Sequence, residues 1–378
     1  MAAPTLTTEI TDTVNARILA VSEDRVAGFH ADPFAEIARL SGVPLGTVLD
    51  RIRGMVAAGT IRRVRQTLLS TNLAPGALVA WRVPAPALDA AFDFMVRDDP
   101  FSGHVVIRST DTETDGSAYR LWTTLKVPQG FSMQRHAEHL AHRVGADAFL
   151  LMPAKALFTL GVGHMRRRGM EPGSRSDEPG RILDTHLVRL TELEWRVLER
   201  LKRELAVDEI IDDPWRARAA EAGVSRDEFL RVARTLDERG VIGRFSTFLE
   251  HVKPSAAGTR VTRYNALFHW RVPPGREIEA GCEVGRHHIL THAYWREGGP
   301  AFANVNIMAV AHGTDKALVL AHKAAIDAHL ADASIEVNYT NVFWGGRSEI
   351  KPSEISPLAY EEWCTREGLD PSTMREAT

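Results

Sequence analysis

Residues 81–84 read Trp-Arg-Val-Pro, and residues 270–273 repeat the same four letters. Other parts of the chain recur around these two stretches at matched intervals, which is typical of an internal duplication. We therefore predict two copies of one unit, each about 160 residues long on the usual size of such units. The further matched pairs are Gly42-Val43-Pro44 with Gly223-Val224-Ser225, Gly59 with Gly240, and His104 and Arg108 with His292 and Arg296.

The composition indicates an ordinary globular protein with more than one domain. The chain has 378 residues, of which 44% are hydrophobic and 25% are charged. Its formal net charge of −3 provides no long-range attraction to nucleic acid or to an anionic membrane. No apolar run approaches the roughly 20 residues of a membrane span, and the polar start of the chain does not resemble a signal peptide. We expect a cytoplasmic protein without membrane contact.

The order of predicted elements indicates the fold class. Apolar residues from Ala16 to Ala58 follow a helical period that is interrupted at residues 41–44, which predicts a helix-turn-helix. Ile61 to Leu69 predicts a strand of the kind found in the wing after such a motif. Residues 78–160 then predict the order β-α-β-β-α-β, the ferredoxin-like motif. The expected fold is α+β, a tandem repeat of a winged helix-turn-helix plus a ferredoxin-like (βαββαβ) domain.

Between the copies lies a segment rich in glycine, proline and charge, which is typical of a linker. It separates two predicted pairs of domains. The expected boundaries are 1–72 for the first winged helix-turn-helix, 73–165 for the first ferredoxin-like domain, 166–185 for the linker, 186–255 for the second winged helix-turn-helix, 256–345 for the second ferredoxin-like domain and 346–378 for a C-terminal tail.

The helix-turn-helix motifs lack the charges of a DNA reader. Such a motif needs cations for phosphate and polar groups for base edges. The candidate recognition helix at 225–239 carries four arginines against four acidic residues, and the one at 45–58 offers few groups for base contact. We therefore predict no sequence-specific DNA binding. The basic segment Arg62-Arg63-Val64-Arg65 leaves two alternatives, a phosphate contact or a clamp for ligand carboxylates.

Residues 286–296 hold the strongest candidate site. If residues 289–295 form a strand, Leu290, His292 and Tyr294 project to one face, with Arg296 next in that row. Histidine can transfer a proton at neutral pH and arginine can hold an anion, so this group suits acid-base chemistry on a carboxylate. The alternative is a set of unconnected histidines at strand ends. The neighbouring candidates are His287 and His288 at the helix-to-strand corner and His312 at the end of the next strand.

The first copy keeps only part of this group. It retains His104 and Arg108 but has Val106 in place of Tyr294, and it has Tyr119-Arg120-Leu121-Trp122 on the following predicted strand. His136, His139 and His142 recur at helical spacing, but no carboxylate or thiolate completes a metal site, so we expect solvated histidines and no metal. The two cysteines have no metal-site spacing either.

Several motifs together resemble a known superfamily. They are Gly59-Thr60-Ile61-Arg62-Arg63, the two Trp-Arg-Val-Pro strand ends, Tyr119-Arg120-Leu121-Trp122, Tyr294-Trp295-Arg296 and His312-Gly313. A winged helix-turn-helix followed by a βαββαβ domain resembles the Lrp/AsnC regulators over nearly the full chain. Within that superfamily these motifs are more similar to the siroheme decarboxylases of haem d1 and alternative haem biosynthesis. The tandem chain resembles their fused two-copy form.

The resemblance implies a non-oxidative carboxy-lyase that removes two acetate carboxyl groups from siroheme to give 12,18-didecarboxysiroheme. It implies no added cofactor, because the tetrapyrrole substrate carries its own iron, which a histidine could ligate. The roles that it implies are proton transfer by His292 and by His287 or His288, orientation by Tyr294, and substrate binding by Arg244, Arg296, Arg62, Arg63, His104, Arg108, Tyr119 and His312.

Two other functions remain open at this point. One is an Lrp/AsnC-type transcriptional regulator that senses a small ligand, and the other is a haem- or tetrapyrrole-binding protein. In each case the two ferredoxin-like domains are expected to form a pseudo-dimer within one chain, and whole chains could dimerise in addition. The neutral recognition helices and the uneven distribution of histidines favour the enzyme.

Overall fold

The computed structural model describes residues 7–158, 170–183, 186–250 and 263–376. The chain divides into two compact units, and each unit takes segments from both halves of the sequence. The helix-turn-helix unit contains Met1–Asn72 and Val188–Arg263, and the sheet unit contains Leu73–Gly161, Met170–Leu187 and Tyr264–Thr378. The division therefore separates the two kinds of domain and not the two copies.

The helices of the helix-turn-helix unit begin and end at the residues that their sequences favour. Asp12 accepts hydrogen bonds from the Val14 and Asn15 N–H groups and so caps the first helix. Gly42, with φ of 65°, ends the second helix in the left-handed conformation that glycine adopts most readily. The helices are α1 (Thr13–Ser22), α2 (Pro33–Ser41) and α3 (Leu45–Ala57) in the first copy, and α7 (Glu192–Leu201), α8 (Trp215–Glu221) and α9 (Arg226–Glu238) in the second.

The wing strands pair across the two copies. Strand β2 (Ile61–Leu68) lies where the sequence predicts a strand, but its antiparallel partner is β8 (Ile242–Leu249) of the other copy. The short strand β1 (Val26–Ala27) pairs with the other edge of β8. Each copy supplies one long wing strand, and its backbone N–H and C=O groups find their partners in the other copy. The helix-turn-helix unit is thus held together by a shared three-stranded sheet.

Both copies of the sheet unit have the predicted order β-α-β-β-α-β. The first contains β3 (Gly76–Arg82), α4 (Leu88–Arg97), β4 (Ser102–Thr110), β5 (Leu121–Lys126), α5 (Met133–Val144), β6 (Ala148–Pro153) and the added strand β7 (Ala156–Phe158). The second contains β9 (Tyr264–Arg271), α10 (Glu277–Gly285), β10 (Leu290–Trp295), β11 (Ile307–Gly313), α11 (Lys316–Asp332) and β12 (Tyr339–Ile350), followed by α12 (Pro357–Arg366).

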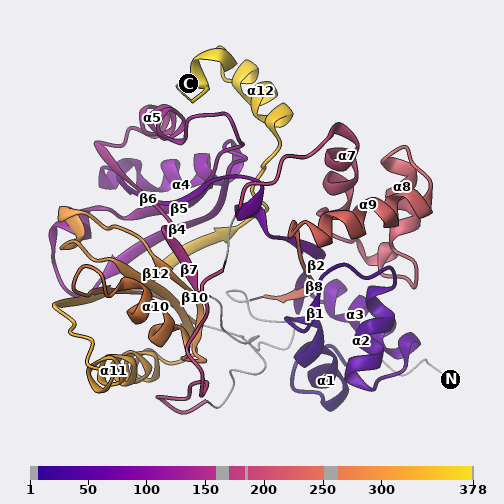
Figure 1. Ribbon diagram of the computed structural model, residues 1–378, viewed down its shortest axis with the longest axis horizontal. Helices are drawn as coiled ribbons and strands as arrows, with labels where there is room; N and C mark the ends of the chain where they lie inside the picture. The colour runs from indigo at the N-terminus through magenta and orange to yellow at the C-terminus, as the bar shows by residue number, and fades with distance from the viewer. Residues whose placement is uncertain (1–6, 159–169, 184–185, 251–262, 377–378) are drawn as a thin grey trace. The chain divides into compact units, whose positions relative to one another are not determined.

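The two copies share one nine-stranded sheet with the order β6-β3-β5-β4-β12-β9-β11-β10-β7. Strand β12 pairs with β9 of its own copy along its first part and with β4 of the first copy along its last part (Figure 1). In the same way, β6 pairs with β3, and β7, which follows it closely in the chain, pairs with β10. The last strand of each copy therefore crosses to the other copy, and the two ends of the sheet are neighbours in the chain.

The sheet has a helix-covered face and an inner face. Side chains alternate between them along each strand. On the helix-covered face, each copy packs its own apolar core, centred on Trp81 in one and on Trp270 in the other. On the inner face, Trp122 of the first copy contacts Phe302 and Phe343 of the second, with ring centroids 5.2 and 5.5 Å apart. The rest of this inner core is Ala80, Val106, Met152, Leu267, Val305 and Met308.

The C-terminal residues are part of the first copy's core. The sequence predicts a separate tail from residue 346, but β12 continues to Ile350, and α12 then inserts Tyr360 and Trp363 against α4 and α5. The fully buried His136 ring lies 4.6 Å from the Trp363 ring, and its Nδ1 lies 3.0 Å from the Tyr360 hydroxyl. The expectation that His136 is a solvated histidine is therefore wrong, because the C-terminal helix covers it.

Truncation of Trp363 should destabilise the sheet unit. Trp363→Ala removes a side chain that is 1% exposed, and we expect the free energy of unfolding to fall by about 3–5 kcal/mol. Leu358→Ala on the same helix is the matched control, because Leu358 is 63% exposed and its loss should cost less than about 0.5 kcal/mol. Urea unfolding followed by tryptophan fluorescence measures both. Equal stability of the two variants would contradict a structural role for α12.

Candidate active site

Both His-x-x-x-Arg pairs lie on the inner face of the sheet. In β10, Ala293 and Trp295 belong to the helix-side core, so His292, Tyr294 and Arg296 project to the opposite face, as predicted. Leu290 does not join them, although the sequence predicts that it does. A bulge between Leu290 and His292 changes the alternation and turns Leu290 into the helix-side core.

The second-copy site is a stack of three side chains from one strand. The rings of His292 and Tyr294 lie parallel, with centroids 5.9 Å apart and 5° between their planes. On its other side, Tyr294 contacts the guanidinium of Arg296, whose central carbon lies 4.4 Å from the ring centroid. His292 is exposed, whereas Arg296 is only 7% exposed. The stack therefore leads from a solvent-accessible imidazole to a buried cation.

Among the residues that the structure describes, Arg296 has neutral partners only. It donates to the backbone carbonyl of Met152 and interacts with Tyr294, while its Nε has no hydrogen-bond partner among the described residues. Burial lowers the pKa of Arg296 and raises that of Tyr294, so the phenol stays protonated near neutral pH. A buried guanidinium without a carboxylate partner is suited to bind an anionic group of a ligand.

A lysine of the first copy lies beside this arginine. Lys126 ends β5 and shares the inner face with Trp122, four residues earlier on the same strand. Its ammonium lies close to Gly76 of β3, where an added Cβ would be 3.3 Å from Nζ. Burial, and secondly the charge of Arg296, lower the pKa of Lys126 to about 8. The residues from the two copies thus place two cations together on the inner face.

The first-copy site is built differently. Arg108 is 4% exposed and donates to Oδ1 of Asn265 at 3.4 Å and to the carbonyl of Phe343 at 3.3 Å. His104 is bonded through Nε2 to the Ser348 hydroxyl at 2.8 Å. His312 lies directly across from Asn265 in the pairing of β11 with β9. Burial lowers the pKa of Arg108 to about 10, and its hydrogen bonds tie β4 to the crossing strand β12.

His287 and His288 are not brought together with His292. His287 is 1% exposed and packs its ring 5.2 Å from that of His329 on α11, on the helix-covered side. His288 bonds through Nε2 to the Ser176 hydroxyl at 3.0 Å. Burial, and secondly the charge of His329, lower the pKa of His287 to about 3, so it holds no proton to donate at neutral pH. The sequence offered no sign of the bulge and helix packing that separate these residues.

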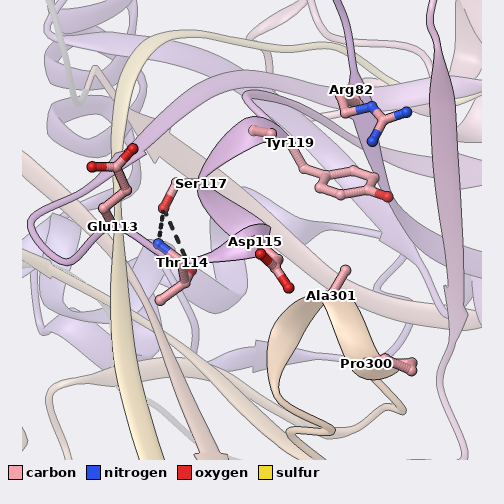
Figure 2. Close-up of a pocket in the computed structure, with 9 residues that line it drawn as sticks. Arg82, Glu113, Thr114, Asp115, Ser117, Tyr119, Pro300 and Ala301 are labelled. Atoms are coloured by element: carbon pink, nitrogen blue, oxygen red, sulfur yellow. Dashed lines mark hydrogen bonds between the residues drawn. The ribbon is translucent and has the colours of Figure 1, made fainter.

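Tyr119 lines a different hollow in the sheet unit. This hollow lies between the loop that joins β4 to β5 and the loop that joins β10 to β11, and its volume is about 680 Å³. Figure 2 shows Arg82 and Tyr119 above the turn that holds Pro300 and Ala301. The Tyr119 ring packs 5.4 Å from that of Phe302. None of the side chains of the second-copy stack lines this hollow.

The remaining predicted arginines belong to the helix-turn-helix unit. Arg63 forms an ion pair with Glu204 at 2.8 Å. Arg62 and Arg65 lie on the same strand, β2, and the guanidinium of Arg65 lies 5.4 Å from the centroid of the Phe248 ring. Arg244 lies on β8, where its side chain is exposed and its backbone N–H donates to the Thr67 hydroxyl.

Sequence reasoning missed two inward-facing residues. Lys126 stands alone in its stretch of sequence without a motif around it. His269 precedes Trp270 of the second Trp-Arg-Val-Pro stretch, whereas Ala80 has this place in the first, and this difference between the copies was a usable signal. The His269 ring is buried 4.9 Å from that of Phe343, and burial followed by the charge of Arg108 lowers its pKa to about 3.

Within the described ranges, no three His, Cys, Asp or Glu side chains are arranged to hold a metal ion. The helices described there are also too short or too polar to cross a membrane.

The known proteins that are similar to this chain belong to one family. A family model described as an AsnC-like ligand binding domain matches residues 74–159. The siroheme decarboxylase of Hydrogenobacter thermophilus is 26% identical over 284 residues, which are 75% of this chain and 78% of that protein. The siroheme decarboxylase alpha subunit of Desulfovibrio desulfuricans is 31% identical over 131 residues, which are 34% of this chain and 70% of that subunit. The chain belongs to the siroheme decarboxylase family. As a member of this family, and so of the Lrp/AsnC-like superfamily, it is a carboxy-lyase.

Solved structures agree on the fold of this siroheme decarboxylase family member. The crystal structure of the siroheme decarboxylase NirDL matches with a TM-score of 0.64 and 20% identity, over 93% of this chain and 99% of that one. A second structure of NirDL, in complex with an iron-uroporphyrin III analogue, matches with a TM-score of 0.63 and 20% identity, over 94% of this chain and 100% of that one. The expected α+β fold of a winged helix-turn-helix with a ferredoxin-like domain is confirmed.

Proposed function

We propose that the chain decarboxylates siroheme, removing two acetate carboxyl groups to give 12,18-didecarboxysiroheme without an oxidant or an added cofactor. The observation that carries this proposal is the second-copy stack, in which an accessible imidazole and a buried, uncompensated guanidinium share one face of the sheet. That pair of groups is what an anionic substrate requires, one to hold a carboxylate and one to supply a proton. The family membership supports siroheme as the substrate.

The proposed step is the loss of carbon dioxide with protonation of the carbon left behind. The bond between the acetate methylene and its carboxylate breaks, its electron pair stays on the methylene carbon, and His292 donates a proton there to form a methyl group. The conjugated macrocycle, which carries its own iron, helps to spread the developing charge. Each of the two decarboxylations thus consumes one proton and releases one carbon dioxide. Because His292 is exposed, water can return the proton.

Arg296 is proposed to hold a carboxylate that remains on the macrocycle. The departing carboxylate loses its charge as carbon dioxide forms, so a cation bound to it would stabilise the ground state more than the transition state and slow the reaction. A cation on a neighbouring, permanent carboxylate orients the substrate without this penalty. Tyr294 is proposed to keep His292 and Arg296 at a constant separation through its two stacking contacts.

The other predicted residues are proposed either to contact the substrate or to support the structure around it. Arg62 and Arg244 stay proposed substrate-binding residues on the family resemblance alone, and Arg63 forms an ion pair with Glu204. In the sheet unit, His104 and Arg108 are proposed to hold the crossing strand β12. His312 and Tyr119 are proposed as secondary substrate contacts. In place of the acid-base role, His287 is proposed to support α11 and His288 to hold the segment that contains Ser176.

Anaerobic incubation of the purified protein with siroheme tests the function. We expect the product mass to fall by two molecules of carbon dioxide and the absorption spectrum to change with it. Ligation of the siroheme iron by a histidine would appear in the same spectra as a band shift on binding, before any mass is lost. An unchanged macrocycle mass, together with salt-sensitive binding to a specific operator, would instead establish a DNA-binding regulator.

The presence of two helix-turn-helix motifs favours that regulator as the second candidate. Their charges disfavour it, because two of the three arginines of α9, and Arg239 directly after it, are paired with acidic side chains. Arg226 bonds Asp213 at 2.8 Å, Arg231 bonds Glu228 at 3.4 Å and Arg239 bonds Glu194. Guanidinium groups already satisfied by carboxylates have less to gain from phosphate. We therefore propose that this unit has no sequence-specific DNA target.

A further inference from the structure

Lys126 is a cation that the proposed reaction has not yet used. It is supplied by the first copy, while the stack of His292, Tyr294 and Arg296 comes from the second. At the equivalent strand end of the second copy, His312 lies opposite Asn265. The two copies therefore have different residues at both of these paired positions. In the first copy the residue opposite Lys126 is Gly76, whose missing side chain leaves room for the ammonium over β3.

The charges around Lys126 do not balance. The Lys126 ammonium lies beside Gly76 of β3. Arg296 bonds the carbonyl of Met152 on β6, and Met152 pairs with Leu78, two residues along β3 from Gly76. No carboxylate among the described residues forms an ion pair with either group. By contrast, Lys155 in the same unit bonds Glu297 at 2.9 Å and Lys323 bonds Asp327 at 2.7 Å. Bringing two like charges together away from water is unfavourable unless an anion joins them. The two cations therefore require an anionic group from a ligand.

We propose that Lys126 is a substrate-binding residue that forms, with Arg296, a two-cation receptor for one retained carboxylate of the tetrapyrrole. The second-copy site is then completed by a residue of the first copy. This inference rests on the proposed function for the identity of the ligand. The receptor matches the requirement that the held carboxylate keep its charge throughout the reaction, so it contributes equally to the ground state and to the transition state.

Kinetics separate this role from catalysis. Lys126→Met should raise the KM for siroheme about tenfold, the worth of one charge-assisted hydrogen bond, with kcat changed by less than about threefold. Lys126→Arg restores the cation and should bring KM back to within about threefold of the wild type. The matched control is Lys155→Met, which removes a lysine already neutralised by Glu297 and should leave KM unchanged.

The pH dependence provides a second readout. With its pKa lowered to about 8, Lys126 is charged below that pH and loses its charge above it, so the affinity for an anionic macrocycle should fall as pH rises from 7 to 9. The charged group near it is Arg296, directly after β10, which keeps its proton over this range, and His104 lies on the adjacent strand β4. Lys126→Arg should remove the decline, because arginine stays charged.

Titration with iron uroporphyrin, a polycarboxylate macrocycle, tests the receptor independently of turnover. Wild-type binding that is weakened about tenfold in Lys126→Met and recovered in Lys126→Arg supports the proposal, even in a protein that fails to decarboxylate siroheme. Equal affinity in wild type and Lys126→Met, with both folded to the same Tm, would overturn it. A loss of Tm in Lys126→Met with no recovery of binding in Lys126→Arg would also overturn it, in favour of a structural role.

Discussion

His292→Ala is expected to abolish siroheme turnover while leaving binding of the macrocycle largely intact. The imidazole is the accessible end of the second-copy stack and the proposed donor of the proton to the new methyl group. Loss of a general acid typically costs about 10² to 10⁴ in rate. The measurement is a single-turnover reaction under anaerobic conditions, with substrate binding followed separately by the absorption spectrum.

Two further histidine variants make this result specific. His142→Ala alters an exposed histidine on α5 and should retain the wild-type rate. His104→Ala alters the duplicate of His292 in the first copy, which is bonded to Ser348, and we expect a much smaller loss than in His292→Ala. Full activity of His292→Ala would remove His292 from the mechanism. An equal loss in His104→Ala would mean that both copies take part in catalysis.

Arg296→Met is expected to weaken siroheme binding about 10- to 100-fold without a matching loss of stability. The substitution removes the guanidinium proposed to hold a carboxylate, a charge-assisted contact worth about 1.5–3 kcal/mol. It also removes a hydrogen bond to the Met152 carbonyl, but replacing a buried charge by an apolar side chain of similar size is often neutral for folding. Spectral titration measures the affinity and thermal unfolding measures the stability.

Arg108→Met, at the equivalent position of the first copy, is the control. It should lower stability more than it lowers the affinity for siroheme. Arg108 donates to Asn265 and to the carbonyl of Phe343, so its removal leaves buried acceptors without a donor. We expect the free energy of unfolding to fall by about 1–3 kcal/mol and the affinity to change less than in Arg296→Met. Wild-type affinity in Arg296→Met would contradict the proposed role of the second-copy site. Equal losses of affinity in both variants would contradict the division between the copies.

Local elements and their order were predictable from the sequence, because the signals for them are local. The periodicity of apolar residues and the glycines at 42 and 223 specify the helices and turns of the helix-turn-helix motifs. The alternation along β10 correctly predicts that His292, Tyr294 and Arg296 share a face. The duplicated spacing predicts that each of these elements occurs twice, which the two βαββαβ domains confirm.

Strand exchange between the copies was not predictable in this way. The backbone hydrogen bonds that join β2 to β8 and β12 to β4 are indifferent to side-chain identity. The sequence also gives no sign of the bulge before His292, which turns Leu290 away from the site. His287, five residues before His292 in the chain, is buried against His329 instead of lying on the face of His292. Proximity in sequence was therefore a poor guide to membership of this site.

By itself the sequence determined that the protein is a duplicated α+β chain, which helices and strands each copy forms, and that an imidazole, a phenol and a guanidinium share a strand face. These follow from periodicity and spacing, which act over a few residues. Only the tertiary structure decided that Lys126 of the first copy lies near Arg296 of the second, and that Arg108 bonds the crossing strand β12 while Arg296 bonds Met152 on β6. Which charges meet, and which are left uncompensated, depends on pairing between distant strands that no local pattern records.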